Sequence, residues 1–120
     1  MNGGYILLDL SNYDLSQSLD TDHLDEANEL TKDEYDKLIS LFKYSQKSGK
    51  PILVKTGLLY DGNENLTFYI RNYTFGTFTG NEALIFTYTK STDNDTNVYV
   101  ALFKYSDGKY YLMVTDEYLL

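Results

Sequence analysis

The residues whose types could support chemistry gather in one acidic stretch, SQSLDTDHLDEANEL, at residues 16–30. His23, the only histidine, lies in this stretch, but a catalytic triad or a histidine-based metal site needs partners that the sequence does not provide. The order of the acids does not match the calcium-loop pattern D-x-[DN]-x-[DN]-G, because Leu24 takes a ligand position and the glycine is missing. We therefore interpret these acids as solvated and predict no metal ion. The four acids concerned are Asp20, Asp22, Asp25 and Glu26.

Other signatures of catalysis are missing from the sequence as well. The chain contains no cysteine, which excludes disulfides, thiolate metal sites and cysteine nucleophiles. It also lacks a glycine-rich phosphate loop, a nucleophile elbow and a pair of acids flanked by apolar residues. The sequence therefore predicts a protein that is not an enzyme and that needs no cofactor.

Charge is distributed unevenly along the chain. Residues 1–36 carry ten acids against Lys32 alone, a net charge of −9, whereas residues 37–120 carry nine bases and eight acids, a net charge of +1. The simplest interpretation is that residues 1–36 are a solvated segment that aids solubility. A more specific interpretation is that their acids mimic the phosphates of a nucleic acid. A further alternative is an acidic inhibitor or immunity-type protein that binds a basic partner through residues 9–36, with the four acids named above as the contact surface. Direct binding of nucleic acid is disfavoured, because no basic stripe could neutralise phosphates.

No part of the sequence has the character of a membrane span or a secretion signal. Its apolar runs fall far short of the roughly 20 residues that a transmembrane helix needs. The N-terminal sequence MNGGYILLDL has no basic region and no cleavage site, and Asp9 interrupts its short apolar run. We expect no signal peptide, no contact with a membrane, and a protein kept in the cytosol or released from it by lysis.

Residues 31–48 are the only stretch that clearly predicts an α-helix. Thr31 and Glu34 have the spacing of a capping box, in which each side chain satisfies a backbone N–H of the first turn. Gly49 can adopt the left-handed conformation that ends a helix, and Pro51 prevents its continuation. Apolar side chains recur at helical spacing along one face, at Tyr35, Leu38, Ile39 and Phe42.

Most of the remaining chain is typical of β-strands joined by tight turns. Apolar runs, several of them alternating, predict strands near residues 5–8, 52–56, 66–79, 83–89, 98–103 and 110–115. Turns are predicted at residues 61–63, 80–81 and 106–108, a bulge at Gly76, and a polar loop at residues 90–97. For residues 16–30 we expect an ordered acidic loop with a turn of helix near residues 24–28, or alternatively a disordered insert.

This order of elements predicts a single α+β domain over residues 1–120. We expect an antiparallel sheet of about five to six strands, with the one helix packed on one face. A single helix covers only one side of such a sheet, so the other side must be polar or covered by another copy of the chain.

Thirteen tyrosines and six phenylalanines are more than a core of this size can hide. Strand propensity explains part of the excess, and tyrosine is also enriched at interfaces. We expect the remainder to be buried between copies of the chain, in a homo-oligomer. An alternative is a carbohydrate-binding module in which exposed tyrosines stack on sugars. The predicted interface residues are Tyr69, Tyr99, Phe103, Tyr105 and Tyr111.

Two short motifs carry a resemblance to a known class of proteins. The chain begins Gly4-Tyr5-Ile6-Leu7-Leu8-Asp9-Leu10, and its helix ends Ser48-Gly49-Lys50-Pro51-Ile52. This pattern resembles small virion structural proteins, of the head decoration or head fibre type, from tailed phages of Firmicutes. The resemblance implies a virion structural or assembly protein without catalysis, located in the virion or the host cytoplasm. It also implies a dimer or trimer formed through the sheet, with other virion proteins as partners.

Overall fold

The computed structural model describes residues 4–60, 62–89 and 97–116, which form an α+β fold of eight strands, one main α-helix and a short 3-10 helix. Five strands form an antiparallel sheet in the order β2-β8-β7-β6-β5. Their bounds are Asn28–Leu30 for β2, Tyr110–Thr115 for β8, Asn97–Lys104 for β7, Asn81–Thr89 for β6 and Asn72–Phe78 for β5.

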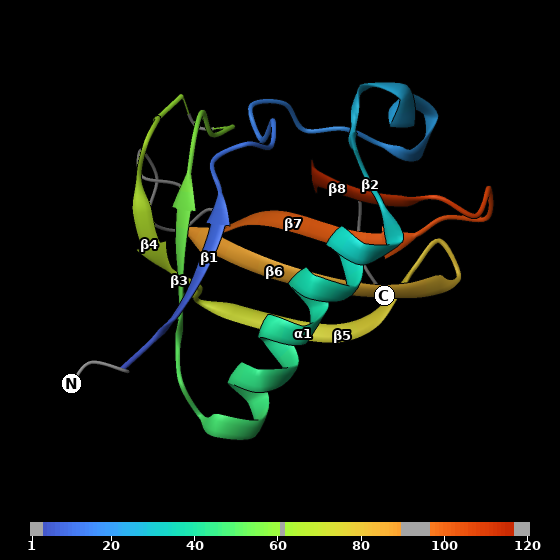
Figure 1. Cartoon of the computed structure of the whole chain (residues 1–120). Helices are drawn as coiled ribbons and strands as arrows, with labels where there is room; N and C mark the ends of the chain where they lie inside the picture. The colour runs from blue at the N-terminus through green and yellow to red at the C-terminus, as the bar shows by residue number, and fades with distance from the viewer. Residues whose placement is uncertain (1–3, 61, 90–96, 117–120) are drawn as a thin grey trace.

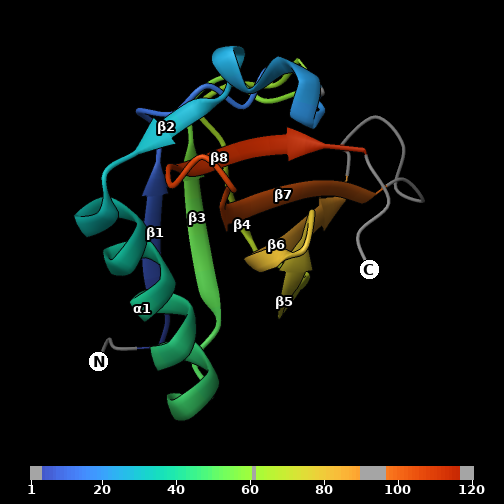
Figure 2. The same ribbon diagram turned by 90° about the vertical axis from the view of Figure 1, so that its right-hand side faces the viewer.

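A second sheet of three strands has the order β1-β3-β4. In this sheet β1 (Ile6–Leu10) runs parallel to β3 (Ile52–Thr56), and β4 (Thr67–Tyr69) runs antiparallel to β3. The smaller sheet and the helix α1 (Lys32–Ser48) both lie in front of the five-stranded sheet, and the strands of the two sheets cross in projection (Figures 1 and 2). The predicted α+β class with its packed helix is confirmed, but the strands divide between two sheets instead of joining one.

The helix begins and ends where its local signals predict. Thr31 Oγ1 accepts a hydrogen bond from Glu34 N, and a Glu34 carboxylate oxygen accepts one from Thr31 N, which completes the capping box. Gly49 ends the helix at φ 77°, in the left-handed region. Phe42 is the centre of the buried face, since its ring packs 5.3 Å from that of Tyr73 on β5 and 5.7 Å from that of Phe86 on β6. The helix therefore holds the edge of the large sheet directly.

The main core lies between the two layers. The small sheet contributes the alternate residues of β1 and β3, the helix contributes its apolar face, and the large sheet contributes one face of β6, β7 and β8. The most deeply buried side chains of this core are Leu8, Leu10, Leu15, Phe42, Ile52, Val54, Leu59, Leu84, Phe86, Val100, Leu102, Leu112 and Val114.

The acidic segment of the same chain packs on part of the opposite face of the large sheet. This segment contains the 3-10 helix η1 (Thr21–Glu26) and the edge strand β2. Leu19, Leu24 and Ala27 pack on a second apolar cluster, and Leu19 N donates a 2.8 Å hydrogen bond to Val114 O. That cluster consists of Phe78, Ala83, Ile85, Ala101, Phe103, Tyr111 and Met113. The prediction offered a polar face or a second copy as the only alternatives, and it overlooked this cover from the same chain, which three apolar side chains interspersed among the acids anchor to the sheet.

Turns and irregular positions follow the sequence only in part. Gly62, Gly80 and Gly108 have φ values of 88°, 81° and 85°, as tight turns at these places require. No bulge occurs at Gly76, which pairs with Ala83 in an unbroken register from one end of β5 to the other. The predicted polar loop at residues 90–97 lies outside the described residues except for Asn97, which begins β7.

Candidate functional site

The large sheet has one long open edge, formed by β5. In the described part of the chain β5 pairs only with β6, over all seven residues of Asn72–Phe78. Its sequence, NYTFGTF, contains no charge and no proline, and five of its seven residues are exposed. Soluble proteins usually protect such edges with charged residues, proline, bulges or very short strands, because an unpaired edge can accept another strand. The described structure has none of these devices on β5.

The other edge strands are short or charged. At the opposite edge of the large sheet β2 has three residues, including exposed Glu29. In the small sheet β4 has three residues, and β1 carries the exposed Asp9. Among the described strands, β5 is therefore the edge best suited to pair with another chain. Figure 1 shows it at the lower margin of the large sheet.

Aromatic side chains flank this edge on both faces of the sheet. Phe75 is 38% exposed and lies on the same side as the helix, where its ring packs edge-on against that of Tyr73. Tyr99, 39% exposed, lies on the other face, beside a shallow groove of about 350 Å³. The groove is lined by Asn72, Tyr73, Thr74, Phe75, Gly76, Ile85, Thr87 and Tyr99. A strand added to β5 would find apolar surface on either side.

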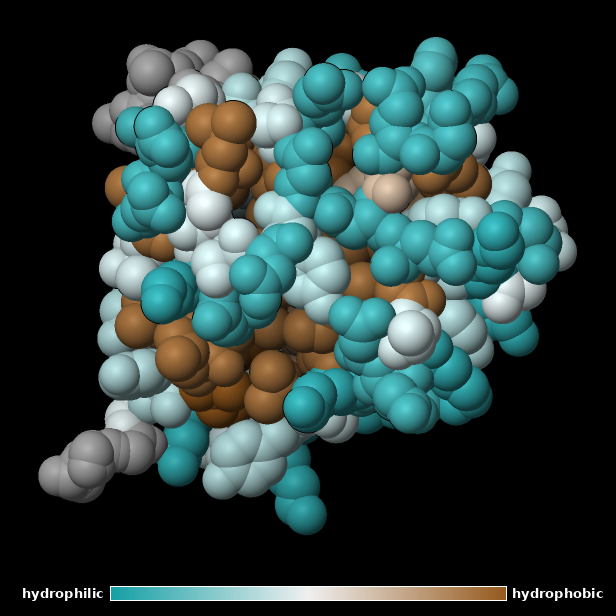
Figure 3. Space-filling view, turned by 45° about the horizontal axis from the view of Figure 1, so that its top comes forward, coloured by the Kyte–Doolittle hydropathy of each residue, from teal (hydrophilic) through white to brown (hydrophobic). Residues whose placement is uncertain are grey.

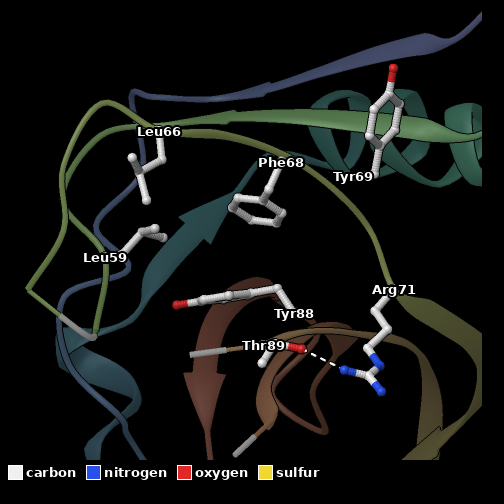
Figure 4. A pocket seen from close by; sticks show the side chains of 7 residues that line it. All are labelled: Leu59, Leu66, Phe68, Tyr69, Arg71, Tyr88 and Thr89. Carbon is white, nitrogen blue, oxygen red and sulfur yellow. Dashed lines mark hydrogen bonds between the residues drawn. The ribbon is translucent and has the colours of Figure 1, made fainter. Parts of the chain in front are cut away.

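A larger groove lies between β4 and the end of β6, between the two sheets (Figure 4). Its volume is about 470 Å³, within the roughly 300–1,000 Å³ typical of small-molecule sites. Figure 4 shows Leu59 and Leu66 at one end, the rings of Phe68 and Tyr88 facing each other in the middle with Thr89 below Tyr88, and Arg71 at the other end. The Phe68 and Tyr88 ring centroids are 4.8 Å apart. The groove is thus apolar at one end and cationic at the other.

Arg71 is fixed by a neighbouring hydroxyl and not by an acid. Its Nη1 donates a 2.8 Å hydrogen bond to Thr89 Oγ1, drawn as the dashed line in Figure 4. The ion pairs found among the described residues involve His23, Lys32 and Lys109, so none of them engages this guanidinium. Arg71 is also the only arginine in the sequence.

The outer face of the small sheet carries a second exposed apolar surface. Leu7, Leu53 and Tyr69 are paired in register across β1, β3 and β4, and Leu7 and Tyr69 are 52% and 55% exposed. Figure 3 shows apolar side chains gathered at the lower left of the view, on the side of the molecule that carries β1. Sequence reasoning missed Leu7 because Ile6-Leu7-Leu8 was interpreted as one apolar run. The alternation of Leu7 with buried Ile6 and Leu8, and its position two residues before exposed Asp9, are the signals that identify it.

The four acids predicted to contact a basic partner differ in how far they are exposed to solvent. Asp22, Asp25 and Glu26 are exposed. Asp20 caps η1 by accepting a hydrogen bond from Asp22 N, and it also lies 2.6 Å from His23 Nδ1. The hydrogen bond from His23 lowers the pKa of Asp20, and the bond to Asp20 together with its charge raises the pKa of His23. Asp20 therefore supports the segment, while the other three face solvent.

The structure separates the five predicted interface residues. Tyr69 and Tyr99 are exposed, and Tyr105 is half-buried against the second cluster. Phe103 is fully buried and Tyr111 nearly so, and the Tyr111 hydroxyl donates a 2.7 Å hydrogen bond to Asp107. Burial, followed by this hydrogen bond, raises the pKa of Tyr111 to about 12. Only Tyr69, Tyr99 and part of Tyr105 can be reached from solvent.

In the part of the chain that the structure describes, no three His, Asp or Glu side chains are grouped so that they could hold a metal ion. None of its helices combines the length and the apolar character needed to cross a membrane.

Comparisons with protein-family models, with curated proteins and with solved structures find no match.

Proposed function

We propose that this protein is a structural or assembly protein of a tailed-phage virion that acts without catalysis and associates with itself through the β5 edge. The observation that carries the self-association is the uncharged, proline-free, regularly paired strand Asn72–Phe78 at the margin of the large sheet. Two copies meeting edge to edge would form one continuous sheet, with backbone hydrogen bonds across the junction. The virion assignment rests on the resemblance of the two short motifs, at residues 4–10 and 48–52, to small head proteins.

The distribution of charge favours this edge over the opposite one. Each copy carries a formal charge of −8, so contact between copies must keep the acidic regions apart. The acidic segment leads into β2, which is at the far edge of the sheet from β5. Pairing through β5 therefore places the two acidic segments at the outer ends of the joined sheet. In a closed two-fold dimer the same strand contacts its own copy, which requires no second complementary surface.

Sedimentation equilibrium of the whole chain over a range of concentrations tests the association. A lysine on the edge should block it, because natural edge strands use lysine for this purpose. Thr74→Lys on β5 is expected to weaken the association at least about ten-fold, since every 1.4 kcal/mol of lost binding free energy is a factor of ten. Thr67→Lys on β4 is the matched control, because Thr67 is also an exposed threonine on an edge strand. It should leave the association unchanged.

A wild-type protein that stays monomeric at millimolar concentration would refute self-association. Equal weakening by Thr74→Lys and Thr67→Lys would show that the contact is not specific to the β5 edge. Far-ultraviolet circular dichroism of both variants checks that each remains folded. The virion assignment has its own test, mass spectrometry of purified particles from the encoding phage, and the absence of the protein from the particles would contradict it.

A second candidate function, binding of a basic protein through the acidic segment, is favoured by one observation. Leu19, Leu24 and Ala27 hold this segment against the sheet, so its exposed acids form an ordered surface and not a loose tail. Charge neutralisation at Asp22, Asp25 and Glu26 should abolish capture of a basic partner and leave sedimentation unchanged. Loss of self-association in this triple variant would instead assign the acids to assembly.

A further inference from the structure

We propose that the groove between the two sheets binds a small organic monoanion, namely a carboxylate attached to a flat or aliphatic apolar body. This inference does not depend on the proposed assembly function, since the groove lies between β4 and β6 and not at the β5 edge.

The apolar body is specified by the inner wall of the groove. Leu59 and Tyr88 are buried and form the floor, while half-buried Leu66 and Phe68 and exposed Tyr69 offer the apolar surface that a ligand could cover. The tilted contact between the Phe68 and Tyr88 rings fixes both side chains before anything binds. A preformed apolar pocket with a few fixed polar groups is the usual form of a small-molecule site.

The anionic group is specified by Arg71 at the other end, together with Thr89. The planar guanidinium has five N–H donors in a geometry that matches a carboxylate, and Thr89 Oγ1 takes one of them. This hydrogen bond holds the guanidinium at the groove and leaves its other donors for an incoming anion. No acidic side chain is among the seven lining residues, so nothing in the lining competes for the charge.

The charge pattern also limits the ligand to a single negative charge. Arg71 is the only cation among the lining residues, whereas a nucleotide or polyphosphate would require several. The net charge of −8 repels polyanions more strongly than monoanions. Apolar surface at one end and one cation at the other fit an amphiphilic carboxylate.

Titration of the whole ¹⁵N-labelled chain with 2-naphthoate, followed by ¹H–¹⁵N correlation spectra, tests this assignment. Two comparison probes separate its parts: 2-naphthamide has the same ring system without the charge, and inorganic phosphate has the charge without the rings. We expect 2-naphthoate to shift the amide signals of Phe68, Arg71 and Thr89 and to bind about ten-fold or more tightly than 2-naphthamide, since hydrogen bonds to charged groups are the stronger ones. Phosphate should shift none of them at the same concentration.

Three variants locate the interaction. Arg71→Gln should reduce the affinity for 2-naphthoate to that for 2-naphthamide, and Thr89→Val should reduce it several-fold by releasing the guanidinium. Lys104→Gln removes an exposed cation on β7, outside the groove, and should leave the affinity for 2-naphthoate unchanged. Unshifted spectra outside the groove show that each variant is folded. Equal binding of naphthoate and naphthamide, binding insensitive to Arg71→Gln, or no shifts at the groove up to millimolar probe would each overturn the proposal.

Discussion

Replacement of Phe42 by alanine should remove the contact that joins the helix to the edge of the large sheet. The side chain is fully buried, and its ring packs on Tyr73 of β5 and Phe86 of β6. Truncation of a buried phenylalanine to alanine costs about 3–5 kcal/mol through lost transfer free energy and the cavity left behind. Two aromatic pairs, each contributing about 0.5–1.5 kcal/mol, place this site in the upper half of that range. We expect a loss of about 4 kcal/mol in the free energy of unfolding.

Urea unfolding followed by far-ultraviolet circular dichroism measures this loss. With an m-value of about 2 kcal/mol/M, typical of small proteins, the midpoint should fall by about 2 M. Tyr44→Ala is the matched control, because Tyr44 is an aromatic residue of the same helix that is half exposed. Its ring has a cation–π contact with Lys50 at 5.8 Å, so its loss should cost less than about 1 kcal/mol. A loss below about 1.5 kcal/mol for Phe42→Ala, or equal losses for the two variants, would refute this account of the packing.

Three further predictions concern local contacts. Thr31→Ala should reduce the free energy of unfolding by about 1 kcal/mol, because Glu34 N loses its acceptor, and Thr31→Ser should restore most of it in the same urea assay. In an NMR titration His23 should show a pKa above 6.5, and Asp20→Asn should return this pKa toward 6.5. The stabilisation from the pair is complete below the unfolded-state pKa of His23 and is lost as the pH rises through the raised folded-state pKa. An unchanged His23 pKa in Asp20→Asn would contradict the pairing. Burial is the main cause that raises the pKa values of Tyr35 and Tyr111 to about 12, above the value of 10.0 for unfolded tyrosine. The free energy of unfolding should therefore fall between about pH 10 and 12. An absorbance titration at alkaline pH that shows no late phase of tyrosine ionisation would contradict these raised pKa values.

Features set by neighbouring residues could be predicted from the sequence. The helix over residues 31–48 was confirmed at both ends, because a capping box and a left-handed glycine act within a few positions of the chain. The strand at residues 52–56 was confirmed for the same reason, since Pro51 and the β-branched residues restrict the backbone locally.

Features that depend on distant pairing could not be predicted in this way. The parallel pairing of Ile6 with Ile52 and the division into two sheets cannot be predicted from the alternation of apolar and polar residues. That alternation indicates which side chains are buried, and not which strand lies next to which. The short connection between Tyr69 and Asn72 has the character of a continuing strand, although it leads from one sheet to the other.

The candidate sites were also only partly accessible to sequence reasoning. Phe103 and Tyr99 belong to the same strand with similar alternation, yet one is buried beside the acidic segment and the other is exposed. Their difference in burial depends on the packing of Leu19 and Leu24, which precede them in the chain by 75 to 84 residues. A similar separation, 84 residues, is spanned by the hydrogen bond from Asn28 Nδ2 to Leu112 O. Arg71 could have been suspected because it is the only arginine in the sequence. Its contact with Thr89 and the groove beside them result from the packing of the two sheets.

The place of β8 in the large sheet has a consequence for how the chain matures. Among the described strands it is the last in sequence, yet it lies inside the sheet between β2 and β7. On the ribosome, which releases the N-terminal part first, β2 has no strand partner and β7 has only β6 until Tyr110–Thr115 emerges. Its pairing with β7 closes a local hairpin, whereas its pairing with β2 joins Asn28 to Leu112, so the slow, non-local step of sheet formation is the docking of β2 on β8.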